Sequence, residues 1–74
     1  MLTRKELVQK FLIQRNTTEQ DFNSSNGYVH YVNQVSDIIR MIQDTKIVTA
    51  WEYAELNGWG IKEFFLVVEL VLKG

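Results

Sequence analysis

The chain reads IKEFFLVVELVL from Ile61 to Leu72, and this is the most continuously apolar stretch of its 74 residues. As a helix it is apolar over most of its circumference, which is typical of a buried helix. A β-strand is the alternative interpretation, because Phe and Val are enriched in strands. Periodicity alone does not distinguish a helix from a strand in so short a run. A membrane-spanning helix needs about 20 apolar residues. Because Lys62, Glu63 and Glu69 interrupt this shorter run, we expect no membrane span.

The segments before Ile61 must pack against this apolar stretch and cover it, and the sequence predicts two long helices among them. Thr3 and Glu6 stand at the spacing of a capping box, in which each side chain accepts a hydrogen bond from the backbone of the other residue. Apolar residues follow at helical spacing, so we expect a first helix from about Arg4 to Arg15. Further along, apolar residues at i, i+3, i+4 and i+7 predict a second helix from about Gly27 to Gln43. Ser25 or Asn26 would cap its start.

The segment from Asn16 to Gly27 joins these helices and is polar except for Phe22. Asn, Ser, Thr and Asp side chains compete with regular structure by bonding to the nearby backbone. We expect a loop with one helical turn around Glu19 to Phe22. Either the loop serves a function, or it is a linker with Phe22 tucked in as an anchor.

Thr49 to Glu52 forms a second capping-box pattern, which predicts a short helix from Ala50 to Asn57. Gly58 would then be its left-handed C′ residue. The alternative is a hairpin, because Asn57-Gly58 is a strong turn signal and Lys46-Ile47-Val48 could begin a strand. We favour a single all-α domain over residues 1–74, a bundle of three to four helices with a buried C-terminal helix. An α+β fold with a C-terminal hairpin is the alternative.

The net charge is −1, but the charges are unevenly distributed. Residues 1–15 carry four basic side chains and one acidic one, a net charge of +3, whereas residues 16–60 carry two basic and six acidic ones, a net charge of −4. Such asymmetry bears on the choice of partner rather than on the fold. The chain has no cysteine and fits a reducing compartment, so we expect a cytoplasmic protein.

The residues that carry out chemistry are scarce. His30 is the only histidine, and with no cysteine available it cannot complete a zinc site. The serines lack the glycine-rich elbow of a nucleophile, and no phosphate-binding loop is present. We therefore expect no catalytic residues, no metal and no cofactor, and we do not expect an enzyme.

Acidic side chains are the better candidates for a binding site. Presented together, they could engage a basic protein surface that normally receives a nucleic-acid backbone, although charged residues also simply solvate a small domain. The predicted partner-binding residues are Glu19, Asp21, Asp37, Asp44, Glu52 and Glu55.

The C-terminal stretch also suggests self-association. Three short helices can hardly cover a helix that is apolar nearly all round, so we expect a homodimer that buries part of it. The predicted interface residues are Phe64, Phe65, Val68 and Leu72.

Residues Thr49 to Leu70 resemble the helix-turn-helix of small DNA-binding regulators, with Ala54 four residues before Gly58 and apolar residues in the next helix. In that family the second helix presents polar and basic side chains to the base edges. Here that helix is mostly apolar, so a helical hairpin used as core is favoured and direct nucleic-acid binding is not expected. The alternative function is such a regulator, which would use Arg4, Lys5, Lys10 and Lys62.

In its capped opening from Met1 to Glu6, its acidic middle and its apolar end, the chain resembles the very small proteins with which bacteriophages disable host machinery. Among these it is most similar to the staphylococcal-phage inhibitors of the DNA polymerase sliding clamp. The resemblance implies a non-enzymatic dimer that occupies the basic DNA channel of the clamp and blocks its loading onto DNA. It also implies that the protein is encoded by a phage and lies in the cytoplasm of the host cell.

Overall fold

The structure is a computed structural model that describes residues 2–22 and 24–73. Within these residues it contains four α-helices and one short 3-10 helix: α1 (Arg4–Gln14), η1 (Glu19–Asp21), α2 (Ser25–Gln43), α3 (Ile47–Leu56) and α4 (Ile61–Lys73). The described residues include no strand, so the predicted all-α bundle is confirmed and the hairpin alternative is wrong. None of these helices has the combination of length and apolar character needed to cross a bilayer.

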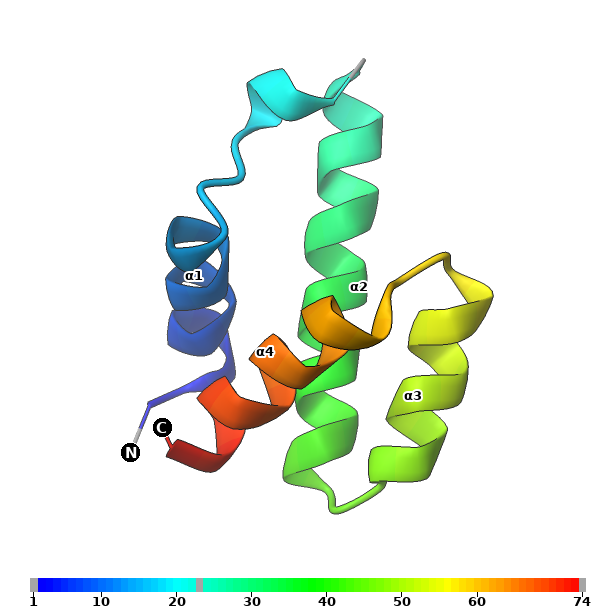
Figure 1. Ribbon diagram of the computed structural model, residues 1–74. Helices are drawn as coiled ribbons and strands as arrows, with labels where there is room; N and C mark the ends of the chain where they lie inside the picture. The colour runs from blue at the N-terminus through cyan, green and yellow to red at the C-terminus, as the bar shows by residue number, and fades with distance from the viewer. Residues whose placement is uncertain (1, 23, 74) are drawn as a thin grey trace.

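The long helix α2 organises the bundle. It has 19 residues and is therefore about 28 Å long. It packs against α1, α3 and α4, and α1 also packs against α4. Figure 1 shows α4 crossing α2 between α1 and α3, with the start of α1 and the end of α4 at the same end of the bundle.

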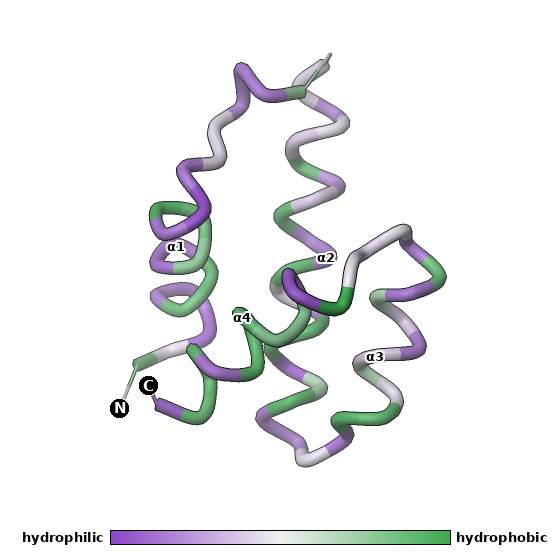
Figure 2. The backbone as a smooth tube through the Cα atoms, viewed as in Figure 1, coloured by the Kyte–Doolittle hydropathy of each residue, from purple (hydrophilic) through white to green (hydrophobic). Residues whose placement is uncertain are grey.

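All four α-helices contribute to one core, and apolar segments (green in Figure 2) recur along each of them. On α3 the inward positions are alanines, whose short side chains let the helix axis approach α2 closely. The buried apolar residues are Leu7, Val8, Phe11, Val35, Ile38, Ile39, Ile42, Ala50, Ala54, Trp59, Phe64, Val67, Val68 and Leu70.

The predicted capping box of α1 is present. The Thr3 hydroxyl accepts from the Glu6 N–H at 3.2 Å, and the Glu6 carboxylate accepts from the Thr3 N–H at 2.9 Å. These hydrogen bonds, the one from the Thr3 backbone first, lower the pKa of Glu6.

Helix α2 begins two residues earlier than predicted. Its cap is Ser24, which accepts from the Gly27 N–H at 3.1 Å, rather than Ser25 or Asn26.

The predicted start of α3 is wrong. The helix begins at Ile47, and its N-cap position is Lys46, which makes no side-chain capping bond. Thr49 therefore lies inside the first turn and forms no capping box. Helix α3 begins early because the reversal before it is tight. The Lys46 N–H donates to the Met41 carbonyl, and the chain turns directly from α2 into α3.

Helices α1, α2 and α3 end in the same way. The residue after each C-cap is left-handed, with φ of 54° at Asn16, 62° at Thr45 and 82° at Gly58. At each end, the N–H of the left-handed residue and the N–H of the residue after it donate to carbonyls of the last helical turn, as in a Schellman motif. The sequence predicted this conformation only at Gly58. Thr45 adopts it against the preference of a β-branched residue.

The expectation that α4 is buried on nearly all sides is only partly met. Phe64, Val67, Val68 and Leu70 are buried, whereas other apolar residues of the same helix face outward. Because α1, α2 and α3 leave the outer side of α4 uncovered, the single chain has an apolar surface there.

The two capping patterns can be compared directly. Thr3→Ala is expected to lower the free energy of unfolding by about 1 kcal/mol, because it removes the N-cap acceptor of α1. Thr49→Ala is the matched control, and it is expected to cost less than about 0.5 kcal/mol because Thr49 is an exposed helix residue. Urea denaturation followed by circular dichroism measures both, and an equal loss in the two variants would contradict the observed start of α3.

The left-handed residue of α2 provides a second test. Thr45→Gly is expected to raise the free energy of unfolding by about 1 kcal/mol, because glycine adopts this conformation without the steric cost that an L side chain carries. Gly58→Ala is expected to lower it by a similar amount, for the opposite reason. Thermal denaturation of both variants is the measurement, and a loss of stability in Thr45→Gly would contradict the strain assigned to Thr45.

Candidate protein-interaction surfaces

Trp59 fixes how the α3–α4 turn sits on the bundle. Its buried indole ring stacks on Phe11 of α1, with ring centroids 6.0 Å apart, and on Tyr31 of α2, at 5.5 Å. The indole N–H donates to the Gln34 side-chain carbonyl at 3.0 Å, and the Gln34 amide in turn donates to Asn57 at 3.4 Å. A buried Trp with its N–H paired anchors the turn to two helices at once.

Glu63 supplies a second attachment for the start of α4. The Tyr31 hydroxyl donates to the Glu63 carboxylate at 2.7 Å, and the Arg15 guanidinium lies 3.4 Å from the same oxygen. Burial, together with the hydrogen bond to the negatively charged Glu63, raises the pKa of the Tyr31 hydroxyl. Because these contacts come from α1 and α2, they set the rotation of α4 about its own axis.

That rotation leaves an apolar strip on the outer side of α4. Ile61, Phe65 and Leu72 are 45%, 57% and 74% exposed and follow one another at helical spacing on one face. We call these three residues the α4 strip. Of the predicted dimer interface, Phe65 and Leu72 belong to the strip, whereas Phe64 and Val68 are buried in the core of the single chain.

The two edges of the α4 strip differ in chemistry. On the α3 side the strip continues into aromatic rings, since Trp51 packs on Phe64 with centroids 5.2 Å apart. On the α1 side the helix carries Lys62, Glu69 and Lys73, which the helical repeat places together. Lys73 donates to Glu69 at 2.7 Å and lowers the pKa of that carboxyl. One edge is therefore apolar and the other charged.

Helix α3 presents a different surface. Val48 and Leu56 are 69% and 88% exposed, although both are large apolar residues, and Glu52 and Glu55 lie exposed between them along the helix. We call these four residues the α3 outer face. Its glutamates were predicted as binding residues from their charge. Val48, Leu56 and Ile61 were not predicted as binding residues. The signal that could have identified Val48 and Leu56 is their position on the face of α3 opposite the buried Ala50 and Ala54. For Ile61 the signal is an apolar residue outside the core-facing side of α4.

The other acidic residues lie elsewhere. The Asp37 carboxylate accepts from the Tyr53 hydroxyl at 3.1 Å and is 4.0 Å from Arg40, so it serves the contact between α2 and α3. Asp44 is the C-cap of α2, close to the start of α3. Glu19 and Asp21 are in η1, at the opposite end of α2 (Figure 1). The six predicted residues therefore occupy two regions: Glu19 and Asp21 lie before the start of α2, whereas the other four lie along the second half of α2 and on α3.

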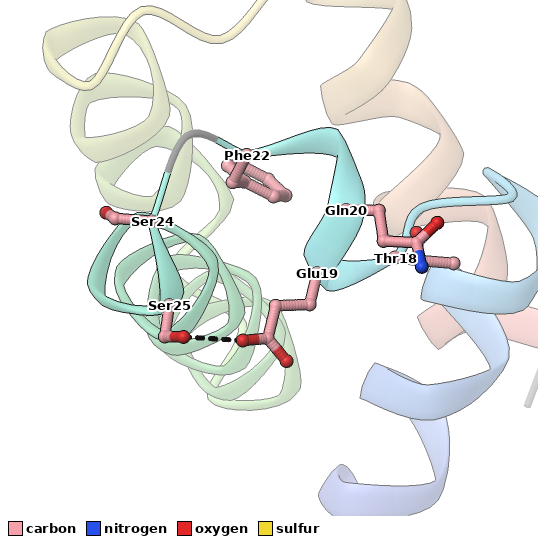
Figure 3. A pocket seen from close by; sticks show the side chains of 6 residues that line it. All are labelled: Thr18, Glu19, Gln20, Phe22, Ser24 and Ser25. Carbon is pink, nitrogen blue, oxygen red and sulfur yellow. Dashed lines mark hydrogen bonds between the residues drawn. The ribbon is translucent and has the colours of Figure 1, made fainter.

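The loop before α2 forms a shallow hollow lined by Thr18, Glu19, Gln20, Phe22, Ser24 and Ser25 (Figure 3). Its polar groups are engaged in local structure. Ser25 donates to the Glu19 carboxylate, and the Ser24 hydroxyl caps α2. Phe22 is half-buried, and its ring contacts Tyr28 and Tyr31 at centroid distances of 5.7 and 5.5 Å. These contacts favour the interpretation of Phe22 as an anchor for the loop.

The described residues contain no group of three or more His, Cys, Asp or Glu side chains placed to hold a metal ion. The turn between α3 and α4 has the length of a helix-turn-helix connection. The helix that would read DNA bases exposes Ile61, Phe65 and Leu72, whereas base recognition uses polar side chains. The geometry of α3 and α4 thus presents surfaces suited to protein contacts.

No protein-family model matches the chain, and neither a curated protein nor a solved structure matches it. The α3 outer face and the α4 strip are therefore the features that bear on its function, because a fold by itself does not imply a function.

The Tyr31–Glu63 contact predicts a pH-dependent effect. Tyr31→Phe is expected to lower the free energy of unfolding by about 1 kcal/mol at pH 8 through loss of the hydrogen bond. Because the folded state raises the pKa of Tyr31, its contribution is complete below the unfolded value of about 10 and declines as the pH rises toward the folded value. The stability difference between the wild type and Tyr31→Phe should therefore shrink above pH 10.

Tyr28→Phe is the control, because no hydrogen bond of the Tyr28 hydroxyl is found among the described residues. Urea denaturation at pH 8 and pH 11 measures both variants. A difference for Tyr31→Phe that grows with pH would contradict the assignment of the raised pKa to this contact.

Proposed function

We propose that this chain is a non-enzymatic binding protein that acts by docking the α3 outer face on a partner protein. One observation carries the proposal: Val48 and Leu56, two large apolar side chains, stand exposed on either side of the carboxylates Glu52 and Glu55. A helix that lays such a face into a groove is a common mode of protein recognition.

The spacing on α3 defines the chemistry of the partner. Val48 and Leu56 are eight residues apart, which corresponds to about 12 Å along a helix. A matching surface has two apolar depressions at that separation with Lys or Arg side chains between them. Burying the two side chains supplies affinity, while the charges contribute orientation and a faster encounter. Asp44 extends the acidic character toward the end of α2.

The resemblance to phage inhibitors of the sliding clamp supplies a specific partner to test. The DNA channel of a clamp ring is basic, and an acidic α3 outer face would be attracted to it. A protein held there excludes DNA from the channel and blocks clamp loading. The acidic region near α3 is smaller than the surface expected from the sequence, because Glu19 and Asp21 are remote from it.

The test is binding of the full chain to a purified bacterial sliding clamp, measured by surface plasmon resonance at several salt concentrations. The proposal expects affinity to fall as salt rises, because exposed charges are screened. Glu52→Gln combined with Glu55→Gln should weaken binding about tenfold, or about 1.4 kcal/mol. Leu56→Ser should weaken it at least as much.

The matched control neutralises Glu19 and Asp21, which lie at the far end of α2, and should leave the affinity unchanged. Absence of clamp binding would remove the clamp as partner. Equal effects of the control and the Glu52 and Glu55 variants would remove the α3 outer face as the docking site. Mobility-shift assays with DNA at low salt separate this function from the regulator alternative, which requires a shifted complex.

A further inference from the structure

The basic residues at the start of α1 take no part in the function proposed for α3. Residues 1–15 carry a net charge of +3, and of their cations Arg15 is paired with Glu63. Arg4 and Lys5 are exposed in the first turn of α1. Because the helix dipole disfavours positive charge at that end, the stability of α1 does not explain these two residues.

Two hollows lie along the seam where α1 packs against α2. The hollow near the start of α1 has a volume of about 420 Å³, and Arg4, Lys5 and Val32 are among the residues that line it. The hollow near the end of α1 has a volume of about 380 Å³, and Leu12 and Tyr28 are among its lining residues. Both volumes fall within the range of about 300–1,000 Å³ that ligand pockets occupy.

The helical repeat joins the two hollows into one groove. Along α1 the lining residues recur at steps of three and four from Lys5 to Ile13, which places them on one stripe. Along α2, Tyr28, Val32 and Ser36 recur at every fourth residue and form the facing stripe. Figure 1 shows the two helices side by side and running in opposite directions. We call this feature the α1–α2 groove, and from Lys5 to Ile13 it is about 12 Å long.

The floor of the α1–α2 groove is apolar. Val8 is buried, and Leu12 and Val32 are half-buried. Ile13 and Val29 are 79% and 53% exposed, and they are the large apolar residues of the described chain that stand exposed outside α3 and α4. Ile13 lines the groove, and Val29 lies one turn before a lining residue of α2. Exposed apolar area therefore continues from the floor onto both rims.

The charges of the α1–α2 groove are of one sign. Among the described residues its lining includes the cations Arg4 and Lys5 and no carboxylate. Arg40 continues the α2 stripe by one more turn, and Asp37, which lies 4.0 Å from it, also accepts a hydrogen bond from α3. The neighbouring acid on α1, Glu6, accepts a backbone N–H in the capping box. One end of the groove is therefore basic and the other uncharged.

We propose that the α1–α2 groove docks an acidic amphipathic helix of a partner protein. The carboxylates of that helix lie at the basic end, near Arg4 and Lys5, and its apolar side chains cover Leu12 and Ile13. A helix laid into a groove through apolar residues at helical spacing is a common mode of recognition. Burial of the apolar floor supplies affinity, and the opposite charges select an acidic partner.

A nucleic acid fits the same groove less well. Proteins that bind a nucleic-acid strand place cations along the whole path of its phosphates, whereas the cations of this groove stand at one end. Phosphates at the other end would lie against Leu12 and Ile13, where charge is desolvated without a partner. A protein helix with an acidic end and an apolar face matches both parts of the groove.

The α1–α2 groove is separate from the α3 outer face. The two surfaces lie on different helices, share no residue and carry opposite charge. The groove therefore takes an acidic segment while the α3 outer face takes a basic surface, and one chain can hold both partners at once. The docking of a helix in the groove does not depend on which protein binds α3.

Fluorescence anisotropy of the full chain with a labelled synthetic helix tests the proposal. The probe carries leucines along one face and glutamates in its first turn, and it is about 12–16 residues long so that it spans the groove. Lys5→Glu is expected to weaken its binding about tenfold, and Ile13→Ser is expected to weaken it by several fold. A probe with glutamines in place of the glutamates should bind the wild type more weakly and be insensitive to Lys5→Glu.

Lys10→Glu is the matched control, because it makes the same change in net charge on the same helix and Lys10 lines neither hollow. It should leave the affinity for the probe nearly unchanged, and circular dichroism confirms that all variants fold. Equal weakening by Lys5→Glu and Lys10→Glu would overturn the groove as the site. So would a lack of binding by the acidic probe up to about millimolar concentration, the level of a very weak complex.

Two further measurements separate other occupants of the groove. A labelled single-stranded DNA that binds more tightly than the probe, and that Lys5→Glu releases, would overturn the proposal in favour of a nucleic acid. Self-association that Lys5→Glu abolishes in analytical ultracentrifugation would overturn it in favour of a second copy. Glu52→Gln with Glu55→Gln should leave binding of the probe unchanged, so failure of the α3 proposal and failure of this one are distinguishable.

Discussion

The stacking of Trp59 between Phe11 and Tyr31 determines how the rest of the molecule is arranged. Trp59 follows directly after the left-handed Gly58, so the turn that ends α3 also delivers a large buried ring to α1 and α2. Since the indole N–H is paired with Gln34, the ring has one satisfied orientation. The direction and rotation of α4 follow from it, and with them the choice of which apolar residues are buried.

Much of the fold could be predicted from the sequence, because helical periodicity is a local property. The spacing of apolar residues identified α2, and the Thr3–Glu6 box located the start of α1. The start of α3 could not be predicted in the same way. The box at Thr49 is a valid local signal, but Thr45 adopts a left-handed conformation that ends α2 and lets α3 begin at Ile47. Such a conformation at a threonine is imposed by the surrounding structure.

The candidate surfaces were less predictable for a related reason. Helix α4 is apolar around most of its circumference, so its periodicity could not indicate which side faces outward. That choice depends on Trp59 and on the contacts of Glu63 with Tyr31 and Arg15, which join residues far apart in the sequence. The acidic set was identified by charge alone, and charge does not reveal that Glu19 and Asp21 lie at the start of α2, apart from the other four residues of the set.

The α3 outer face and the α4 strip arise from the same limitation of a small domain, which cannot bury all of its apolar surface. Helix α3 packs on α2 through Ala50 and Ala54, so its attachment uses short side chains and leaves Val48 and Leu56 without a role in the core. Each contributes about 1.5–3 kcal/mol only when a partner buries it fully. Because these residues add little to folding while exposed, the stability of the chain does not explain their presence. The proposed binding by α3 would explain it, and the charged residues between them would then select the partner.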